Sequence, residues 1–349
     1  MPPLFRRIIG LFSLLFGTAL FLFAVALGGI VYFNAPPAEI PPGAGIDGSV
    51  TFEVRNGESA WSVGQRLEEG GIIKSRYFWY LLARFDREYI KTGLYRLELP
   101  ASQMAIRSVF VSGRQILQKV TIPEGVTLKK IARILAEAEI CDEEAFLAAA
   151  ADRETLSSYR IPGLTMEGYL YPDTYLFPPA YPASRVVAAM ADTFFTRLKE
   201  IRDDILSLSP EELNRRVIIA SIVEREYRVD EEAALMAGVF YNRLEIGMAL
   251  QSCATVEYVI TEIQGRPHPE VLYTRDTEIR DPYNTYIRPG LPPGPISAPG
   301  KVALQAAFNP AASDYLYFRL VDSASGQHYF SKTLDDHIRA GVLYVKRNS

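Results

Sequence analysis

An uncharged stretch near the N-terminus constrains this chain more than any other feature. Residues 8–33 contain no charged side chain. About 20 apolar residues are enough to cross a bilayer as a helix, in which every backbone group is hydrogen-bonded internally. Arg6 and Arg7 precede the run, and the next basic residue is Arg55. This asymmetry predicts a single-pass anchor in residues 1–33, with a cytoplasmic N-terminus and the rest of the chain outside the plasma membrane, in the periplasm if the cell has an outer membrane.

A cleaved secretory signal is the alternative to an anchor. Such a signal normally has an apolar core of only about 7–15 residues, so the longer run favours an uncleaved anchor. The following segment, residues 34–50, contains four prolines and three glycines. Because proline stiffens a chain and removes hydrogen-bond donors, we expect a linker that holds the soluble part away from the membrane.

Composition excludes several classes of protein. The 349 residues include 37 Lys and Arg against 41 Asp and Glu, a net charge of −4 without a basic block, which argues against a nucleic-acid partner. Three His and two Cys, widely scattered, do not suggest a metal site. Cys141 and Cys253 are far apart in sequence, so no disulfide framework can be predicted, although a single bond between them remains open.

The first part of the soluble region has a β-α-α-β pattern. Residues 51–54 alternate like a strand, and residues 59–67 have helical spacing. A second helical stretch covers residues 72–85, and residues 93–97 return as a strand. A strand, a turn and a helix recur at residues 120–136, which is either a weak internal repeat or ordinary local packing.

Both segments resemble LysM domains, small β-α-α-β modules that bind glycans containing N-acetylglucosamine. We therefore expect a LysM-like subdomain within residues 51–156, followed by a second domain in residues 157–349, where Tyr and Pro become frequent. The predicted fold class is α+β with one N-terminal transmembrane helix. Four aromatic residues of the first region are of the kind that more often fill a core than bind a ligand: Trp61, Phe78, Trp79 and Tyr80.

One predicted helix is a candidate for chemistry. Ser209 can cap its start, with Glu212 completing a capping box, and the helix should run to about Tyr227. Residues 217–223 are apolar apart from one serine, which predicts burial on most sides. Glu224 follows directly, so the buried face continues into a carboxylate.

Desolvation disfavours the charged form of a carboxyl group, so we expect the pKa of Glu224 to be raised. A glutamate that keeps its proton near neutral pH can protonate a leaving oxygen. The alternative is a structural glutamate paired with an arginine such as Arg243, and the residues alone leave both interpretations open. Glu226 lies about 200° further around the helix, and we expect it to meet solvent together with Arg225.

Polar groups suited to sugar hydroxyls and acetamido groups follow this helix. They lie at the end of a second predicted helix from Asp230 to about Glu245, just after it, and in the proline-rich stretch 281–300. Ordinary surface polarity is the alternative for any single one. The candidates are Tyr241, Asn242, Arg243, Gln251, Ser252, Asn284 and Tyr286.

Several ordered motifs are together similar to the YceG-like family, the endolytic murein transglycosylases (MltG), over nearly the whole chain. The motifs are Glu167 to Tyr175, Ala220 to Glu226, Val239 to Leu244, Leu250 to Ser252, Pro282 to Tyr286, Gly290 to Ile296 and His328 to Ser331. Two segments, three residues in all, depart from the family pattern. Cys253-Ala254 replaces a frequent Asp-Pro, and Ala298 replaces a frequent Asn.

The resemblance implies a carbon–oxygen lyase that cleaves the β-1,4 bond between N-acetylmuramic acid and N-acetylglucosamine inside nascent glycan strands and so helps to end their polymerisation. Its substrate is peptidoglycan, with membrane-bound peptidoglycan synthases as candidate partners. The catalytic glutamate of the family falls on Glu224, and the motif that contains Glu167 and Tyr169 is assigned to substrate binding. No metal and no organic cofactor is implied.

The expected mechanism needs a single carboxyl group. Glu224 would protonate the glycosidic oxygen and then take a proton from the 6-hydroxyl of the sugar, which closes on C1 as a 1,6-anhydro ring; the attack is intramolecular, so proximity replaces a second catalytic group. A muramidase-type hydrolase would instead need a second carboxylate, such as Glu167 or Asp173. A non-catalytic, membrane-anchored glycan-binding scaffold is the third possibility.

Overall fold

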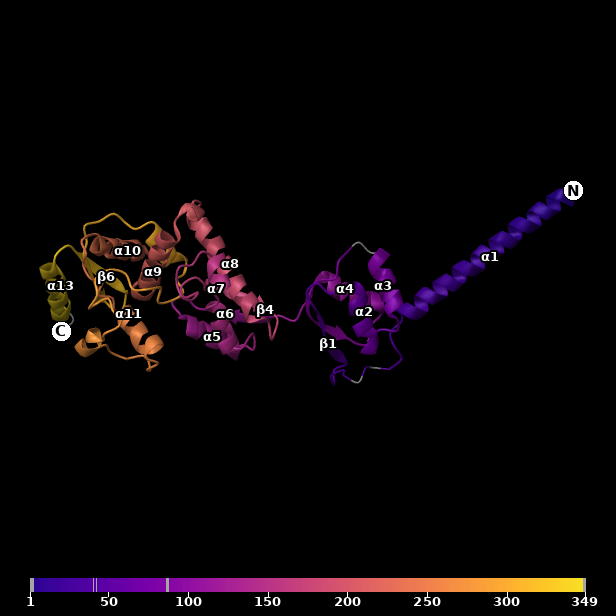
Figure 1. The fold of residues 1–349 in the computed structure, drawn as a ribbon, viewed down its shortest axis with the longest axis horizontal. Helices are drawn as coiled ribbons and strands as arrows, with labels where there is room; N and C mark the ends of the chain where they lie inside the picture. The colour runs from indigo at the N-terminus through magenta and orange to yellow at the C-terminus, as the bar shows by residue number, and fades with distance from the viewer. Residues whose placement is uncertain (1–2, 40, 42, 86–87, 348–349) are drawn as a thin grey trace. The chain divides into compact units, whose positions relative to one another are not determined.

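The computed structural model describes residues 3–39, 41, 43–85 and 88–347. The chain divides into two compact units, residues 1–117 and 118–349, each with its own hydrophobic core (Figure 1). The boundary differs from the one expected after residue 156. Residues 118–156 belong to the second unit because their strand pairs with a strand beyond residue 170 and their helices pack in the second core.

The first unit begins with a long apolar helix, α1 (Pro3–Asn34). Its segment Leu14–Asn34 has the length and composition of a membrane span, and its side chains are unburied. A helix of this kind is compatible with the single-pass anchor that the sequence predicts.

The end of α1 contacts the folded part of the first unit directly. The Gln103 side-chain amide donates a hydrogen bond to the Phe33 carbonyl (2.9 Å), and the Phe33 ring stacks on Phe78 at 6.4 Å. The amide N–H of Met104 donates to the Asn34 side chain (3.0 Å). The proline-rich segment therefore follows a helix whose end already packs on the first unit, and its role as a spacer stays a prediction.

Two antiparallel strands enclose a helix pair in the first unit, as the sequence predicts, and a further helix follows. The strands pair from Ser49 opposite Glu98 to Val54 opposite Gly93. The likeness of this unit to LysM domains stays a prediction. Its elements after α1 are β1 (Ser49–Val54), α2 (Ala60–Glu69), α3 (Arg76–Phe85), β2 (Gly93–Glu98) and α4 (Gln103–Ser112).

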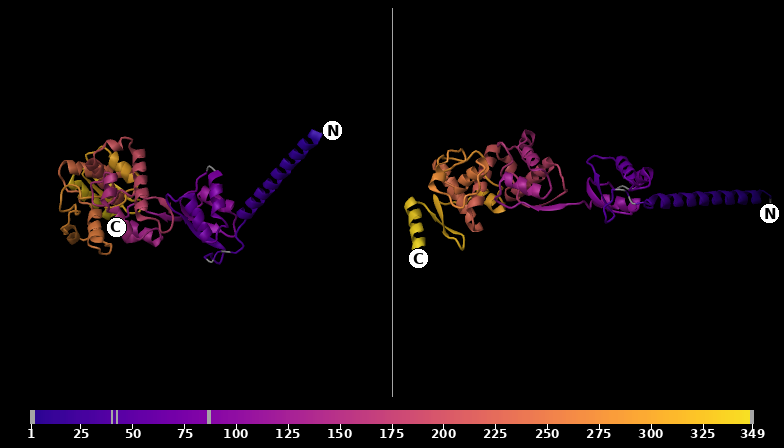
Figure 2. Two further views of the ribbon diagram at one scale, coloured as in Figure 1. Left: turned by 45° about the vertical axis from the view of Figure 1, so that its right-hand side comes forward. Right: turned by 90° about the horizontal axis from the view of Figure 1, so that it is seen from below.

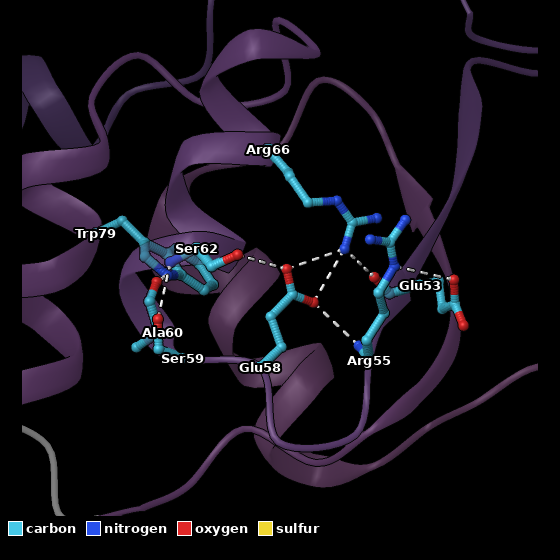
Figure 3. Close-up of polar contacts among 8 residues, drawn as sticks. All are labelled: Glu53, Arg55, Glu58, Ser59, Ala60, Ser62, Arg66 and Trp79. Carbon is cyan, nitrogen blue, oxygen red and sulfur yellow. Dashed lines mark hydrogen bonds and ion pairs between the residues drawn. The ribbon is translucent and has the colours of Figure 1, made fainter.

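A buried carboxylate fixes the turn between β1 and α2 (Figure 3). Glu58 accepts hydrogen bonds from the backbone N–H of Arg55 (3.0 Å) and from the Ser62 hydroxyl (2.9 Å). The Arg66 guanidinium lies 2.9 Å from the same carboxylate. Burial acts to raise the pKa of Glu58, but these bonds outweigh it and hold the pKa below its usual value. The carboxylate therefore ties the strand to the first turns of the helix.

The aromatic residues of α2 and α3 divide between core and surface. Trp79 and Phe78 are buried, as expected for core residues. Trp61, Tyr77 and Tyr80 are exposed, and the Trp61 ring lies edge-on to both tyrosine rings at 5.4 and 5.7 Å. The expectation of a core role is therefore wrong for Trp61 and Tyr80.

The second unit combines helices with two small antiparallel sheets, which confirms the α+β class. One sheet joins β3 to β4, and the other joins β5 to β6, against which α13 packs at one edge of the unit (Figure 2). Its elements are β3 (Gln118–Thr121), α5 (Leu128–Glu137), α6 (Glu143–Ala150), α7 (Arg153–Ser158), β4 (Thr174–Phe177), α8 (Ala183–Ile201), η1 (Ile205–Ser207), α9 (Pro210–Glu226), α10 (Asp230–Glu245), α11 (Cys253–Tyr258), η2 (Val259–Ile263), η3 (Thr274–Glu278), α12 (Lys301–Phe308), β5 (Tyr317–Asp322), β6 (Gln327–Ser331) and α13 (Leu334–Arg347).

Helix α9 lies at the centre of this core. The Ser209 hydroxyl caps it by accepting the N–H of Glu212 (3.2 Å), and every residue from 217 to 223 is buried. Its single serine, Ser221, donates to the carbonyl of the preceding turn and accepts the N–H of Ile296 (3.0 Å). The serine thus fixes the proline-rich stretch against the helix, which positions the candidate site.

Candidate active site

Two carboxyl groups end helix α9, and they face different surroundings. Glu224 accepts a hydrogen bond from the backbone N–H of Gly300 (2.8 Å). A side chain at Gly125 would lie against it, since an added Cβ there would be 3.7 Å from Glu224 Cγ. Burial first, and then the charges of Glu124 and Asp230, raise the pKa of Glu224 to about 8, although the Gly300 bond opposes this shift.

Glu226 is half-buried and hydrogen-bonded rather than open to solvent, contrary to our expectation. Its carboxylate accepts hydrogen bonds from the Ser252 hydroxyl and from the N–H of Ala254. Burial raises the pKa of Glu226 in spite of these two donors. Arg225 is not free in solvent either, because it forms an ion pair with Glu257 at 2.9 Å and is only 14% exposed. The sequence expectation is wrong for both residues because other elements of the fold cover this side of α9.

A cavity of about 760 Å³ lies beside Glu226. Its walls come from the end of α9, from α10 and α11, from the proline-rich stretch, and from β5, β6 and α13. Glu226 is among the described residues that line it, and Glu224 is not. A partly enclosed, polar-lined space next to a carboxyl group of raised pKa is the usual setting of an acid catalyst.

Three of the predicted substrate-binding residues line this cavity, namely Arg243, Gln251 and Tyr286. Gln251 has a left-handed backbone (φ 51°), a conformation that costs a residue with a side chain about 1–3 kcal/mol, and its N–H donates to the Thr285 carbonyl (3.0 Å). The surrounding contacts therefore impose the placement of Gln251 at the cavity wall. Ser252, also predicted, acts on Glu226 through its hydroxyl rather than as part of the wall.

The side chains of three other predicted residues donate hydrogen bonds to backbone carbonyls inside the protein. The Tyr241 hydroxyl donates to the Ala307 carbonyl (2.9 Å). The Asn242 amide donates to two backbone carbonyls of the segment before β5, at 2.7 and 2.9 Å. The amide of Asn284, which is fully buried, donates to two carbonyls of residues 277–279, at 2.9 and 2.8 Å. These contacts hold loops in place, so a role in substrate binding stays a prediction for all three.

Glu167 and Tyr169 lie in the core. The Glu167 carboxylate accepts the N–H of Leu128 (3.0 Å) and the Tyr258 hydroxyl (3.3 Å), which caps α5, and burial raises its pKa to about 8. Tyr169 is 1% exposed and donates to the side chain of Asn214 (2.9 Å). Neither residue is among those described as lining the cavity beside Glu226.

Basic residues that the sequence did not single out line the same cavity. Arg225 immediately precedes Glu226, Arg228 lies two residues after it, and Arg319 comes from β5. The pattern Arg225-Glu-Tyr-Arg228 was visible in the sequence as a charged end of a buried helix. Arg319 carried no such signal, because only the packing of β5 brings it to this place.

Comparison with known proteins agrees with this fold. The YceG-like family model matches residues 52–341, most of the chain. The protein therefore belongs to the YceG-like family. A yceG-like protein of Listeria monocytogenes, solved at 2.6 Å, matches with a TM-score of 0.55 and 30% identity, covering 83% of this chain and 98% of that one.

Curated relatives carry a functional name. A Streptococcus pneumoniae protein named endolytic murein transglycosylase is 30% identical over 327 residues, 85% of this chain. The match spans only 58% of the pneumococcal protein. A Bacillus subtilis protein of the same name is 28% identical over 314 residues, 85% of either chain.

Proposed function

We propose that this protein is an endolytic murein transglycosylase. It would cleave the β-1,4 bond between N-acetylmuramic acid and N-acetylglucosamine of nascent peptidoglycan strands, leave 1,6-anhydro ends, and so limit strand growth. The observation that carries the proposal is the carboxyl group of Glu226, half-buried at the wall of a 760 Å³ cavity. Membership of the YceG-like family and the names of the curated relatives support the activity. The family resemblance implies that Glu224 is the catalytic glutamate, whereas the position of the cavity favours Glu226.

In this proposal Glu226 acts first as acid and then as base. Its raised pKa keeps a proton available for the glycosidic oxygen of the leaving sugar. Once the proton has left, the Ser252 hydroxyl and the Ala254 N–H stabilise the carboxylate. That carboxylate then removes the proton of the 6-hydroxyl as its oxygen bonds to C1, which needs no water and no second acid.

A hydrolase would need a second carboxylate, and the sequence candidates for that role do not reach this cavity. Glu167 is buried in the core, and Asp173 lies beside Arg197 (3.7 Å) at a separate cavity of about 290 Å³. Glu257 does line the same cavity, but its carboxylate is paired with Arg225 at 2.9 Å. These positions favour the transglycosylase over the muramidase.

Glu224 and Glu226 can be separated by a matched pair of substitutions, each from Glu to Gln. We expect Glu226→Gln to lower kcat for murein cleavage by roughly 10²–10⁴-fold, because it removes the acid. Glu224→Gln should stay within about tenfold of wild type. Mass spectrometry of the products should show 1,6-anhydro ends; reducing ends would identify a hydrolase.

The opposite result has a clear meaning. If Glu224→Gln abolishes cleavage and Glu226→Gln does not, Glu224 is the acid, as the sequence predicts. If both variants cleave like wild type, the carboxyl groups of α9 are not catalytic and the acid lies elsewhere. If the wild-type protein does not cleave murein, the enzymatic proposal fails, which would leave a glycan-binding scaffold.

We also propose the placement that such a substrate requires. Arg6 and Arg7 precede the apolar helix, so the N-terminus would be cytoplasmic and both folded units would be outside the plasma membrane. Synthases that extend glycan strands at the same membrane surface are the candidate partners.

A further inference from the structure

The cavity beside Glu226 carries more positive charge than the cleavage chemistry uses. Four arginines line it, against two glutamates, although the whole chain has a net charge of −4. Arg225 is compensated by Glu257. No acidic side chain of the described residues pairs with Arg243 or Arg319. A basic wall in an acidic protein points to an anionic ligand, because neutral sugar hydroxyls do not require cations.

Three basic groups gather at the part of the cavity formed by α10, β5 and α13. Arg243 donates to the carbonyls of Leu316 (2.6 Å) and Leu250 (2.7 Å), which fixes its direction but leaves its charge uncompensated. Its guanidinium lies 5.1 Å from the Tyr317 ring, and that ring lies 5.5 Å from His337. The Tyr317 ring therefore lies next to both Arg243 and His337.

His337 has an unused hydrogen-bonding atom. Its Nδ1 is buried without a partner among the described residues. Burial, and then the nearby charges of Arg319 and Arg243, hold the pKa of His337 below its usual value, so all three groups are close together. A buried ring nitrogen without a partner is costly unless something else binds it.

Arg319 reaches this cluster because α13 has a glycine opposite it. A Cβ added at Gly341 would lie 2.0 Å from Arg319 Nη1, so the guanidinium occupies the space that any other residue would fill. The glycine has an ordinary helical backbone, so the conformation itself does not require it.

We propose that Arg243, Arg319 and His337 form a subsite for the carboxylates of the peptide stem that murein carries on its muramic acid. Forked guanidinium groups bind carboxylates with two parallel hydrogen bonds. Tyr286 lines the same cavity as the subsite and Glu226. The enzyme thus prefers strands that still carry peptides. This inference rests on the proposed transglycosylase function.

The test compares peptide-bearing murein strands with the same strands stripped of peptide by an amidase. Neither preparation carries a lipid diphosphate at the end of its strands. The peptide carboxylates are therefore the anionic groups that differ between the two. Wild-type kcat/KM should be about tenfold higher for the peptide-bearing strands. Arg319→Gln should bring the ratio close to one. Arg339→Gln is the control, because Arg339 lies on α13, pairs with Asp336 and is not among the residues that line the cavity.

A second variant tests whether misfolding, rather than loss of the subsite, explains the effect of Arg319→Gln. Gly341→Ala adds only a methyl group to a helix, which ordinarily favours that helix, but it displaces the Arg319 guanidinium. It should lower the ratio like Arg319→Gln while the thermal unfolding temperature stays near that of wild type.

Two results would overturn the subsite: equal kcat/KM for both strands in the wild type, or an equal ratio in Arg319→Gln and Arg339→Gln. If the wild type cleaves neither strand, the proposed function fails instead. Calorimetric binding of the two strands to the wild-type protein then decides the subsite independently, and equal affinity would exclude it.

Discussion

Two glutamates of one helical turn show what helical spacing can and cannot resolve. Glu224 lies over Val217, Ala220 and Ser221, which predicted its burial. The same rule places Glu226 over Ile219, Ile222 and Val223, which are equally apolar, and the structure buries all of them. Helical spacing is therefore compatible with two shielded carboxyl groups, although we expected only Glu224 to be buried. Their hydrogen-bond partners and the position of the cavity distinguish them.

The hydroxyl of Ser252 offers a direct test of Glu226 as the titrating acid. Its bond stabilises the charged carboxylate, so Ser252→Ala should raise the pKa of Glu226 further. Because the reaction begins with the protonated acid, activity falls as pH rises through this pKa. The basic limb of the kcat/KM profile should move upward, by about one unit at most.

Glu224 accepts no bond from Ser252, so a limb that belongs to Glu224 would not move. Ser325→Ala, in the turn between β5 and β6, serves as the control because its hydroxyl bonds only to Asp322 and to the N–H of Gln327. An unmoved limb in Ser252→Ala would contradict the assignment to Glu226.

At the scale of secondary structure elements, polar side chains at helix starts fix where several helices begin and what they join. Glu58 joins β1 to α2, Glu167 caps α5, and Ser209 caps α9. The Ser209 cap was predictable from local sequence. The Glu167 cap was not, because its partner Leu128 lies 39 positions earlier. Assigning Glu167 to substrate binding from its motif alone therefore missed its buried position.

Loss of the Glu58 carboxylate should destabilise the first unit. We expect Glu58→Ala to lower the free energy of unfolding by about 2 kcal/mol. The substitution leaves the Arg66 guanidinium without its carboxylate partner and leaves the Arg55 N–H and the Ser62 hydroxyl without an acceptor. The folded pKa of Glu58 is lowered, so its stabilisation is full above about pH 4.3 and is lost as pH falls through the folded value. Both tryptophans, Trp61 and Trp79, lie in this unit, so fluorescence in denaturant reports its unfolding.

The exposed pair of Glu53 and Arg55 provides the matched control. These side chains are 56% and 64% exposed and 3.7 Å apart. Glu53→Ala should change stability by less than about 0.5 kcal/mol. Equal effects of the two substitutions would show that the Glu58 network adds nothing beyond surface charge.

The buried carboxyl group of Glu167 should make the second unit sensitive to alkali. Its folded pKa is raised to about 8, so the folded state holds a proton that the unfolded chain releases above about pH 4.3. Stability should therefore decline as pH rises between these values. Glu167→Gln has no such proton to lose. Its stability relative to wild type should increase by on the order of 2 kcal/mol between about pH 5.5 and about pH 7.5, as measured by calorimetry.

The same variant also tests the hydrolase alternative. Glu167→Gln should keep cleaving murein, because Glu167 does not reach the cavity. Loss of cleavage in a variant that unfolds normally would instead indicate a second catalytic carboxylate.

At the scale of the whole molecule, the chain combines one apolar helix, long enough to cross a membrane, with two folded units. Both cysteines lie in the second unit and are free; Cys253 is exposed at the cavity, and Cys141 is half-buried. Their placement leaves no disulfide between them, which the sequence had left open.

The exposed thiol of Cys253 tests the orientation in the membrane. A membrane-impermeant maleimide, applied to cells without their wall, should label the protein if this unit is outside. Burial raises the pKa of Cys253, so the labelling should be faster at alkaline pH. Cys141→Ser should keep the label and Cys253→Ser should lose most of it. Labelling that requires lysis of the cells would place the unit in the cytoplasm.

The sequence by itself determined the features that depend on near neighbours along the chain. The apolar helix, the β-α-α-β order of the first unit, the cap and burial of α9, and the family motifs are all of this kind, because burial periodicity and capping act over a few residues. Only the tertiary structure decided which carboxyl group faces the cavity, that Glu167 and Asn284 support loops, and that Arg319 joins Arg243 and His337. Those relations join segments dozens of residues apart, and the packing of the whole second unit sets them.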